Sequence, residues 1–192
     1  MVSHIVGGSL GIISLVLCTI FAASHNNVYG IVSGIIFSIS IIVMYVFSSI
    51  YHGLRESTAK KVFQVLDHCA VFILIAGSYT PFALCTFREY NEIFGWLLFA
   101  FIWGLAILGI VLNAIDLRKF RVFSMICYLV MGWCIIFRAD LLLQLLGNIG
   151  FSLLLSGGIV YTLGTIFYGL GRNHKYMHSI FQLFILVANI FQ

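Results

Sequence analysis

Three ionisable side chains in an otherwise apolar sequence have the chemistry of metal ligands: His52, Asp67 and His178. Ser48 precedes His52 by four residues, and Gln182 follows His178 by four. In a helix this spacing places each pair on one face, one turn apart. A carboxyl and two imidazoles, with a hydroxyl and a carboxamide beside them, resemble a catalytic zinc site, in which three protein ligands leave a fourth position for water.

Asp67 is the one acidic side chain that falls inside an apolar segment. The other acidic residues lie at the ends of such segments or between them: Glu56, Glu89, Glu92, Asp116 and Asp140. A charged group at membrane depth is costly and usually faces the inside of a helix bundle, so it marks a functional site. His68 is rotated about 100° from Asp67 around the same helix, so we expect it to support the site from outside or to be a packing residue.

The segments that must position these groups are strongly apolar. The chain is 62% hydrophobic and 8% charged, whereas soluble domains are roughly half apolar and about a quarter charged. A membrane-spanning helix needs about 20 mostly apolar residues. We therefore predict an all-α integral membrane bundle, a single domain over residues 1–192, with seven transmembrane helices at residues 4–24, 28–52, 62–86, 93–114, 121–138, 149–171 and 177–192.

The composition also excludes other classes of protein. The five cysteines lie in apolar segments and lack the paired spacing of zinc ribbons or disulfide frameworks, so we interpret them as packing residues. The formal net charge of +4 is spread over short loops, which argues against nucleic-acid binding. The expected partner is a membrane lipid, as substrate or as ligand.

The basic residues predict an orientation. Eight of the ten lie in the loops after the second, fourth and sixth predicted helices, and only Arg88 and Arg138 lie on the other side. Short cytoplasmic loops retain Lys and Arg. The N-terminus is therefore predicted to be cytoplasmic and the C-terminus outside, which places His52, Asp67 and His178 near the cytoplasmic face.

Six runs of residues, spread over nearly the whole chain, form a specific combination. They are residues 48–52, 66–68, 74–82, 132–133, 157–168 and 178–181. This combination resembles the bacterial hemolysin III family, which is grouped with the progestin and adipoQ receptors, including the adiponectin receptors, and more distantly with alkaline ceramidases. The resemblance implies a seven-helix bundle with its N-terminus inside, here in a bacterial inner membrane.

The resemblance also implies a zinc ion near the cytoplasmic leaflet. Its ligands would be a histidine matching His52 and two histidines four apart in the last helix, while an aspartate matching Asp67 holds the zinc-bound water beside a serine matching Ser48. The first histidine of the last helix matches His178, but Gln182 occupies the second position. A carboxamide oxygen is a poor zinc ligand beside imidazole or carboxylate.

The leading functional hypothesis is a zinc-dependent hydrolase of amide-linked lipids, acting in membrane lipid homeostasis, or its descendant with a degenerate metal site. Asp67 and Ser48 would be the catalytic residues, and His52, His178 and, weakly, Gln182 the metal ligands. One alternative is a pore-forming, haemolytic protein. The predicted spans argue against it, because they carry few polar residues that could line an aqueous path. Another is a receptor-like module that senses a lipid without turning it over, so the sequence leaves open whether the protein is an enzyme.

Overall fold

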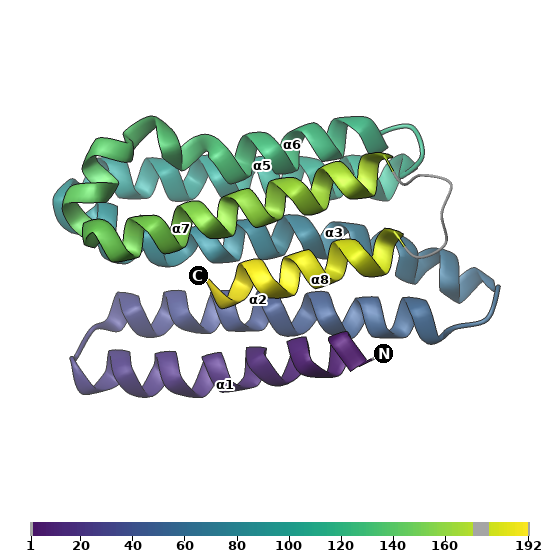
Figure 1. The fold of residues 1–192 in the computed structure, drawn as a ribbon, viewed down its shortest axis with the longest axis horizontal. Helices are drawn as coiled ribbons and strands as arrows, with labels where there is room; N and C mark the ends of the chain where they lie inside the picture. Colours follow the sequence, from purple (N-terminus) through teal and green to yellow (C-terminus); the bar gives the residue numbers. More distant parts are fainter. Residues whose placement is uncertain (1, 171–176, 192) are drawn as a thin grey trace. The chain divides into compact units, whose positions relative to one another are not determined.

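The computed structural model describes residues 2–170 and 177–191, with side chains for 5–167 and 180–191. Every element in these ranges is helical. Figure 1 shows the long helices joined by short turns. The elements are α1 (Val2–Ser24), α2 (Val28–Gly53), α3 (Thr58–Pro81), the π-helix η1 (Phe82–Phe87), α4 (Arg88–Tyr90), α5 (Glu92–Asp116), α6 (Arg121–Trp133), the 3₁₀-helix η2 (Cys134–Arg138), α7 (Ala139–Leu170) and α8 (Met177–Ile190).

Side-chain caps explain where three of the long helices begin. The Asn27 side chain accepts a hydrogen bond from the backbone N–H of Gly30 at 2.8 Å, at the start of α2. Ser57 caps α3 and Asn91 caps α5 in the same way, with distances of 3.2 and 3.0 Å. Such caps satisfy backbone N–H groups that have no partner within the helix. The turns between the apolar segments are therefore encoded by single polar residues.

The third apolar segment changes its helix type at Pro81. Proline has no backbone N–H and cannot donate the helical hydrogen bond to residue 77. Directly after Pro81 the chain forms η1, and the backbone N–H of Arg88 bonds the carbonyl of Ala83, five residues back. The interruption at Pro81 thus takes the form of a π-helix, a feature often found at functional positions.

Five segments are long and apolar enough to cross a membrane, judged over the described residues by length and composition. Four of them match the first four predicted spans: Ile5–Ser24, Val28–Gly53, Thr58–Tyr90 and Glu92–Asp116. The fifth, Arg121–Phe167, contains 47 residues, and α8 contributes only the shorter apolar helix Ile180–Ile190. The all-helical membrane architecture is confirmed, while the count of seven and the sides of the termini stay predictions.

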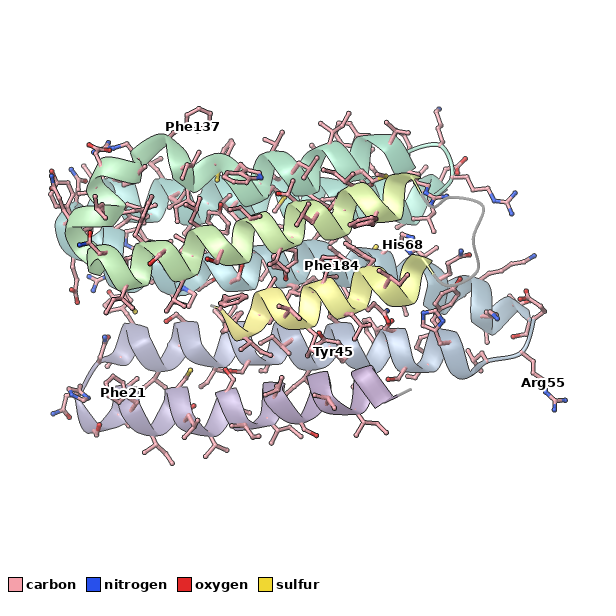
Figure 2. The ribbon with its side chains drawn as sticks, in the orientation of Figure 1. Phe21, Tyr45, Arg55, His68, Phe137 and Phe184 are labelled. Atoms are coloured by element: carbon pink, nitrogen blue, oxygen red, sulfur yellow. The ribbon has the colours of Figure 1, made fainter. Side chains whose placement is uncertain are left out.

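The helices group into two compact units, residues 1–124 and residues 125–192. In the first, α1 packs on α2, α2 on α3, and α3 on α5. Its core is closely packed and mostly apolar, with fully buried Met44, Phe72, Leu74, Ile102 and Ala106. Tyr45 is labelled on α2 in Figure 2, and its ring lies directly against Gly7 of α1. Small residues of this kind let membrane helices approach closely.

The second unit is built mainly from α7 and α8, which pack on each other. The Tyr161 hydroxyl of α7 donates to the Asn189 carboxamide oxygen of α8 at 3.0 Å. The Trp133 indole N–H donates to the Thr162 hydroxyl at 2.8 Å. Residues 139–148, which the sequence predicts to be a loop, are helical, and the break is confined to Gly147 at φ 67° and ψ 178°.

Candidate functional site

The Asp67 carboxyl is buried inside the first unit. It lies on α3 with 3% of its surface exposed. The Tyr51 phenol of α2 lies close enough to interact electrostatically with Asp67 and Glu56, and it hydrogen-bonds with the Gln64 side chain. A buried carboxyl that interacts with a polar group on the neighbouring helix is the arrangement expected of a functional residue at membrane depth.

Ser48 and His52 lie on the same side of α2 but differ in burial. Ser48 is fully buried at 0% exposure, whereas His52, one turn later in the last turn of the helix, is exposed. The His52 ring lies 4.8 Å from the Tyr51 ring, centroid to centroid, at an interplanar angle of 56°. The end of α2 therefore carries a hydroxyl inside the packed region and an imidazole at its edge.

Gln182 is the described member of the predicted pair on α8. Its side chain is 1% exposed, although it carries a polar carboxamide. The His178 side chain lies outside the described residues. Convergence of His52, Asp67 and His178 on one cavity consequently stays a prediction.

The donor set decides how well these residues suit zinc. Among residues with described side chains, no three His, Cys, Asp or Glu side chains gather closely enough to hold a metal ion. Imidazole nitrogen and carboxylate oxygen are usual zinc donors, and His52, Asp67 and His178 supply them. The buried Gln182 supplies an amide oxygen instead. By donor chemistry alone the predicted set would suit zinc with one weak member, and zinc binding stays a prediction.

Two polar contacts near this level of the first unit were not predicted from the sequence. Gln64 takes part in two contacts. Its side chain hydrogen-bonds with Tyr51, and its backbone carbonyl oxygen lies 2.8 Å from Nδ1 of His68. The Ser124 hydroxyl donates to the carboxamide oxygen of Asn113, which is fully buried, at 2.6 Å. Asn113 is a neutral amide inside an apolar run, and that alone could have drawn attention to it, because buried amides need hydrogen-bond partners.

The similarity of this protein to known proteins extends over the whole chain. The family model described as "Haemolysin-III related" matches residues 1–192. The chain belongs to this family. It is 40% identical to Hemolysin-3 of Bacillus cereus and 37% identical to the Hemolysin-3 homolog of Bacillus subtilis (strain 168), in each case over 96% of this chain and over 83% and 85% of the relative, respectively. These matches confirm the resemblance read from the motifs.

A more distant relative of this haemolysin-III family protein is the human monocyte to macrophage differentiation factor. The identity is 26%, over 80% of this chain and 64% of that protein. This match supports the wider grouping with the progestin and adipoQ receptors. No solved structure gives a significant match. The match to the haemolysin-III family and the apolar helices together indicate a multi-pass membrane protein.

Proposed function

We propose that this protein is a membrane-embedded, zinc-dependent hydrolase of amide-linked lipids whose metal site has lost one histidine ligand. The observation that carries the proposal is the Asp67 carboxyl, which is buried on α3 with 3% of its surface exposed. A carboxylate inside a membrane helix is costly to insert, by up to about 2.5–3.5 kcal/mol at the helix centre. A purely structural role would be served at lower cost by an apolar side chain.

The residues divide the chemical work as follows. Asp67 is the general base that accepts the proton of the attacking water and returns it to the leaving amine as the C–N bond breaks. Ser48 donates a hydrogen bond to the amide carbonyl of the lipid. Zinc, when bound by His52 and His178, lowers the pKa of water toward about 7 and polarises a carbonyl. Tyr51 is the polar group on the neighbouring helix that would interact electrostatically with the Asp67 carboxylate. The amide-linked substrate follows from the family resemblance to ceramidases.

The same proposal includes seven spans, with the N-terminus in the cytoplasm of a bacterial inner membrane. The segment Arg121–Phe167, at 47 residues and about 1.5 Å per residue, exceeds twice the roughly 30 Å of the hydrocarbon core. The 3₁₀-helix η2 and the break at Gly147 interrupt it. Two crossings in this segment, together with α8, raise the five apolar segments to seven.

Membrane perturbation is the second candidate function, because two relatives carry the name Hemolysin-3. The core of the first unit gives it little support. Its centre is filled by apolar side chains such as Phe72, Leu74 and Ile102, which do not line an aqueous path. Dye release from liposomes containing the purified protein tests this candidate directly, and sustained release would favour it.

The experiment for the leading proposal measures zinc and hydrolysis on the same samples. Wild type and the variants Gln182→His, His178→Ala and Asp67→Asn are purified in detergent, titrated with zinc and assayed on amide-linked lipids. We expect partial, chelator-sensitive zinc in wild type. Gln182→His should raise affinity by about 10-fold to 100-fold, the scale of ligand and outer-shell changes. Asp67→Asn should lower hydrolysis by about 10²–10⁴-fold, as expected for loss of a general base.

Three outcomes are informative beyond the expected one. Equal, tight zinc binding by wild type, Gln182→His and His178→Ala would show that residues 178 and 182 are not ligands. Zinc and lipid binding without turnover, even in Gln182→His, would favour the lipid-sensing module. Hydrolysis unaffected by Asp67→Asn would remove this carboxyl from the mechanism.

A further inference from the structure

Two contacts hold the Arg88 side chain in a fixed position. It lies in the first unit, at the same end as the turn between α1 and α2. Its guanidinium carbon lies 3.5 Å from the centroid of the Tyr29 ring, and its Nε donates to the carbonyl of Leu84 at 2.9 Å. These contacts occupy one face and one edge of the guanidinium. The two terminal nitrogens remain, in a fork whose geometry matches the oxygens of a phosphate.

Two further features build this position. A Cβ at Gly95 of α5 would lie 2.6 Å from the Cα and N atoms of Arg88, so only glycine allows the backbone of Arg88 to approach α5 this closely. The Tyr29 ring, beneath the guanidinium, packs edge-on against Trp96 at a centroid distance of 6.5 Å. Residues from α2, η1 and α5 together therefore position this one arginine.

No carboxylate neutralises this arginine. The ion pair between Lys60 and Glu56, at 3.2 Å, does not involve Arg88. Glu89 and Glu92 are close in sequence to Arg88 and exposed, yet neither pairs with it. Glu92 lies one turn before Trp96, on the same face of α5, whereas Glu89 is rotated about 100° from Arg88 around α4. Among the described residues Arg88 therefore has no ion-pair partner, at an end of the unit that also carries two exposed carboxylates.

The surroundings correspond to the headgroup level of a membrane. Tyr and Trp side chains gather at membrane–water interfaces, and Tyr29 and Trp96 adjoin Arg88. An aromatic stripe continues along the Glu92 face of α5: Trp96, Phe99 and Trp103, whose successive ring centroids lie 5.9 and 6.0 Å apart. A lipid acyl chain can pack along this stripe from a headgroup bound at Arg88, whereas a free phosphate has no acyl chain to contact it.

We propose that Arg88, Tyr29 and Glu92 form a headgroup site for a zwitterionic phospholipid with a primary ammonium, such as phosphatidylethanolamine. The Arg88 terminal nitrogens donate to the phosphate, and the Glu92 carboxylate accepts from the ammonium. Charge complementarity favours this headgroup over one with only negative charge, which Glu89 and Glu92 repel. It also favours the ammonium over choline, which has no N–H to donate. This site is separate from Asp67 and does not depend on the hydrolase proposal.

Native mass spectrometry of the detergent-purified full chain provides the test. The protein is titrated with phosphatidylethanolamine, phosphatidylcholine and phosphatidylglycerol of matched acyl chains, and Kd is measured for the first lipid bound. We expect the ethanolamine lipid to bind about tenfold more tightly than the other two, the scale of one charge-assisted hydrogen bond. Arg88→Gln should abolish this preference. Phosphoethanolamine without acyl chains should not compete at matched concentration.

Glu92→Gln and Glu89→Gln form the matched pair of variants, because they remove the same charge at the same end of the molecule. Glu92→Gln should remove most of the preference for ethanolamine and leave the Arg88–Tyr29 contact intact, and Glu89→Gln should leave the preference within about twofold, the effect of an exposed charge. Thermal unfolding in detergent checks that each variant is folded. The proposal is overturned by equal effects of the two glutamate variants, by tighter binding of phosphatidylglycerol, or by an unchanged preference in folded Arg88→Gln.

Discussion

Gly109 shows how a single hydrogen atom in place of a side chain sets the distance between two helices. It lies on α5 against the ring of Phe72 on α3, and a Cβ at this position would overlap that ring. Phe72 is fully buried, so it has little room to move aside. Helices in lipid associate largely through close van der Waals contact. The α3–α5 contact, and with it the surroundings of Asp67 on α3, depends on this glycine.

We therefore expect Gly109→Ala to destabilise the protein by about 1–3 kcal/mol, the usual cost of overpacking a tight contact. Gly104→Ala is the matched control, because it lies on the same helix and a Cβ there would meet no atom within 4 Å. Unfolding of both variants in mixed micelles, followed by circular dichroism, measures the difference. Equal stability of the two variants would show that Phe72 repacks without cost.

At the scale of helices, the sequence predicts the apolar segments well and their internal breaks poorly. The predicted spans 28–52 and 93–114 agree closely with α2 and α5, because the capping residues Asn27 and Asn91 interrupt long apolar runs. The predicted loop at 139–148 is wrong, since this stretch is helical and the break is the single residue Gly147. Hydropathy reports which residues prefer lipid, but it contains no information on one residue's backbone angles.

Gly147 adopts a φ of 67° and a ψ of 178°, a backbone conformation essentially restricted to glycine that costs other residues about 1–3 kcal/mol. We expect Gly147→Ala to destabilise the protein by about that amount. Gly158→Ala, in the helical part of α7 where a Cβ would meet no atom within 4 Å, should instead be neutral or stabilise by up to about 1 kcal/mol. Chemical denaturation of the two variants in the same detergent compares them. Stabilisation by both would contradict the glycine-restricted backbone geometry at residue 147.

The candidate site was only partly accessible to sequence reasoning. Asp67 could be singled out because one carboxyl in an apolar segment is conspicuous, and its burial agrees with that reasoning. Sequence reasoning could not identify the contact of Tyr51 with Gln64 or the hydrogen bond between Asn113 and Ser124. Each joins neutral residues from different helices, so the partner depends on helix rotation and register. Apolar periodicity fixes neither closely enough.

At the scale of the whole molecule, the prediction concerns the sides of the membrane. Basic residues concentrate at Arg118, Lys119 and Arg121, whereas the turn at 88–92 carries a single arginine and two glutamates. Because cytoplasmic loops retain basic residues, a reporter fused within residues 115–120 should read as cytoplasmic. One fused within 88–92 should read as external. Alkaline phosphatase and green fluorescent protein fusions give opposite signals on the two sides, and a reversed pattern would overturn the proposed orientation.

The π-helix η1 has a consequence for how this chain can change over evolutionary time. Because its hydrogen bonds span five residues, deleting any one residue of Phe82–Phe87 would let an ordinary α-helix continue through the segment. Everything beyond the deletion would then rotate by about 100° relative to α3, and Arg88 would leave the face of Tyr29. We expect insertions and deletions here to be far less tolerated than substitutions. Descendants of this chain should therefore accept amino-acid substitutions in this segment but keep its length.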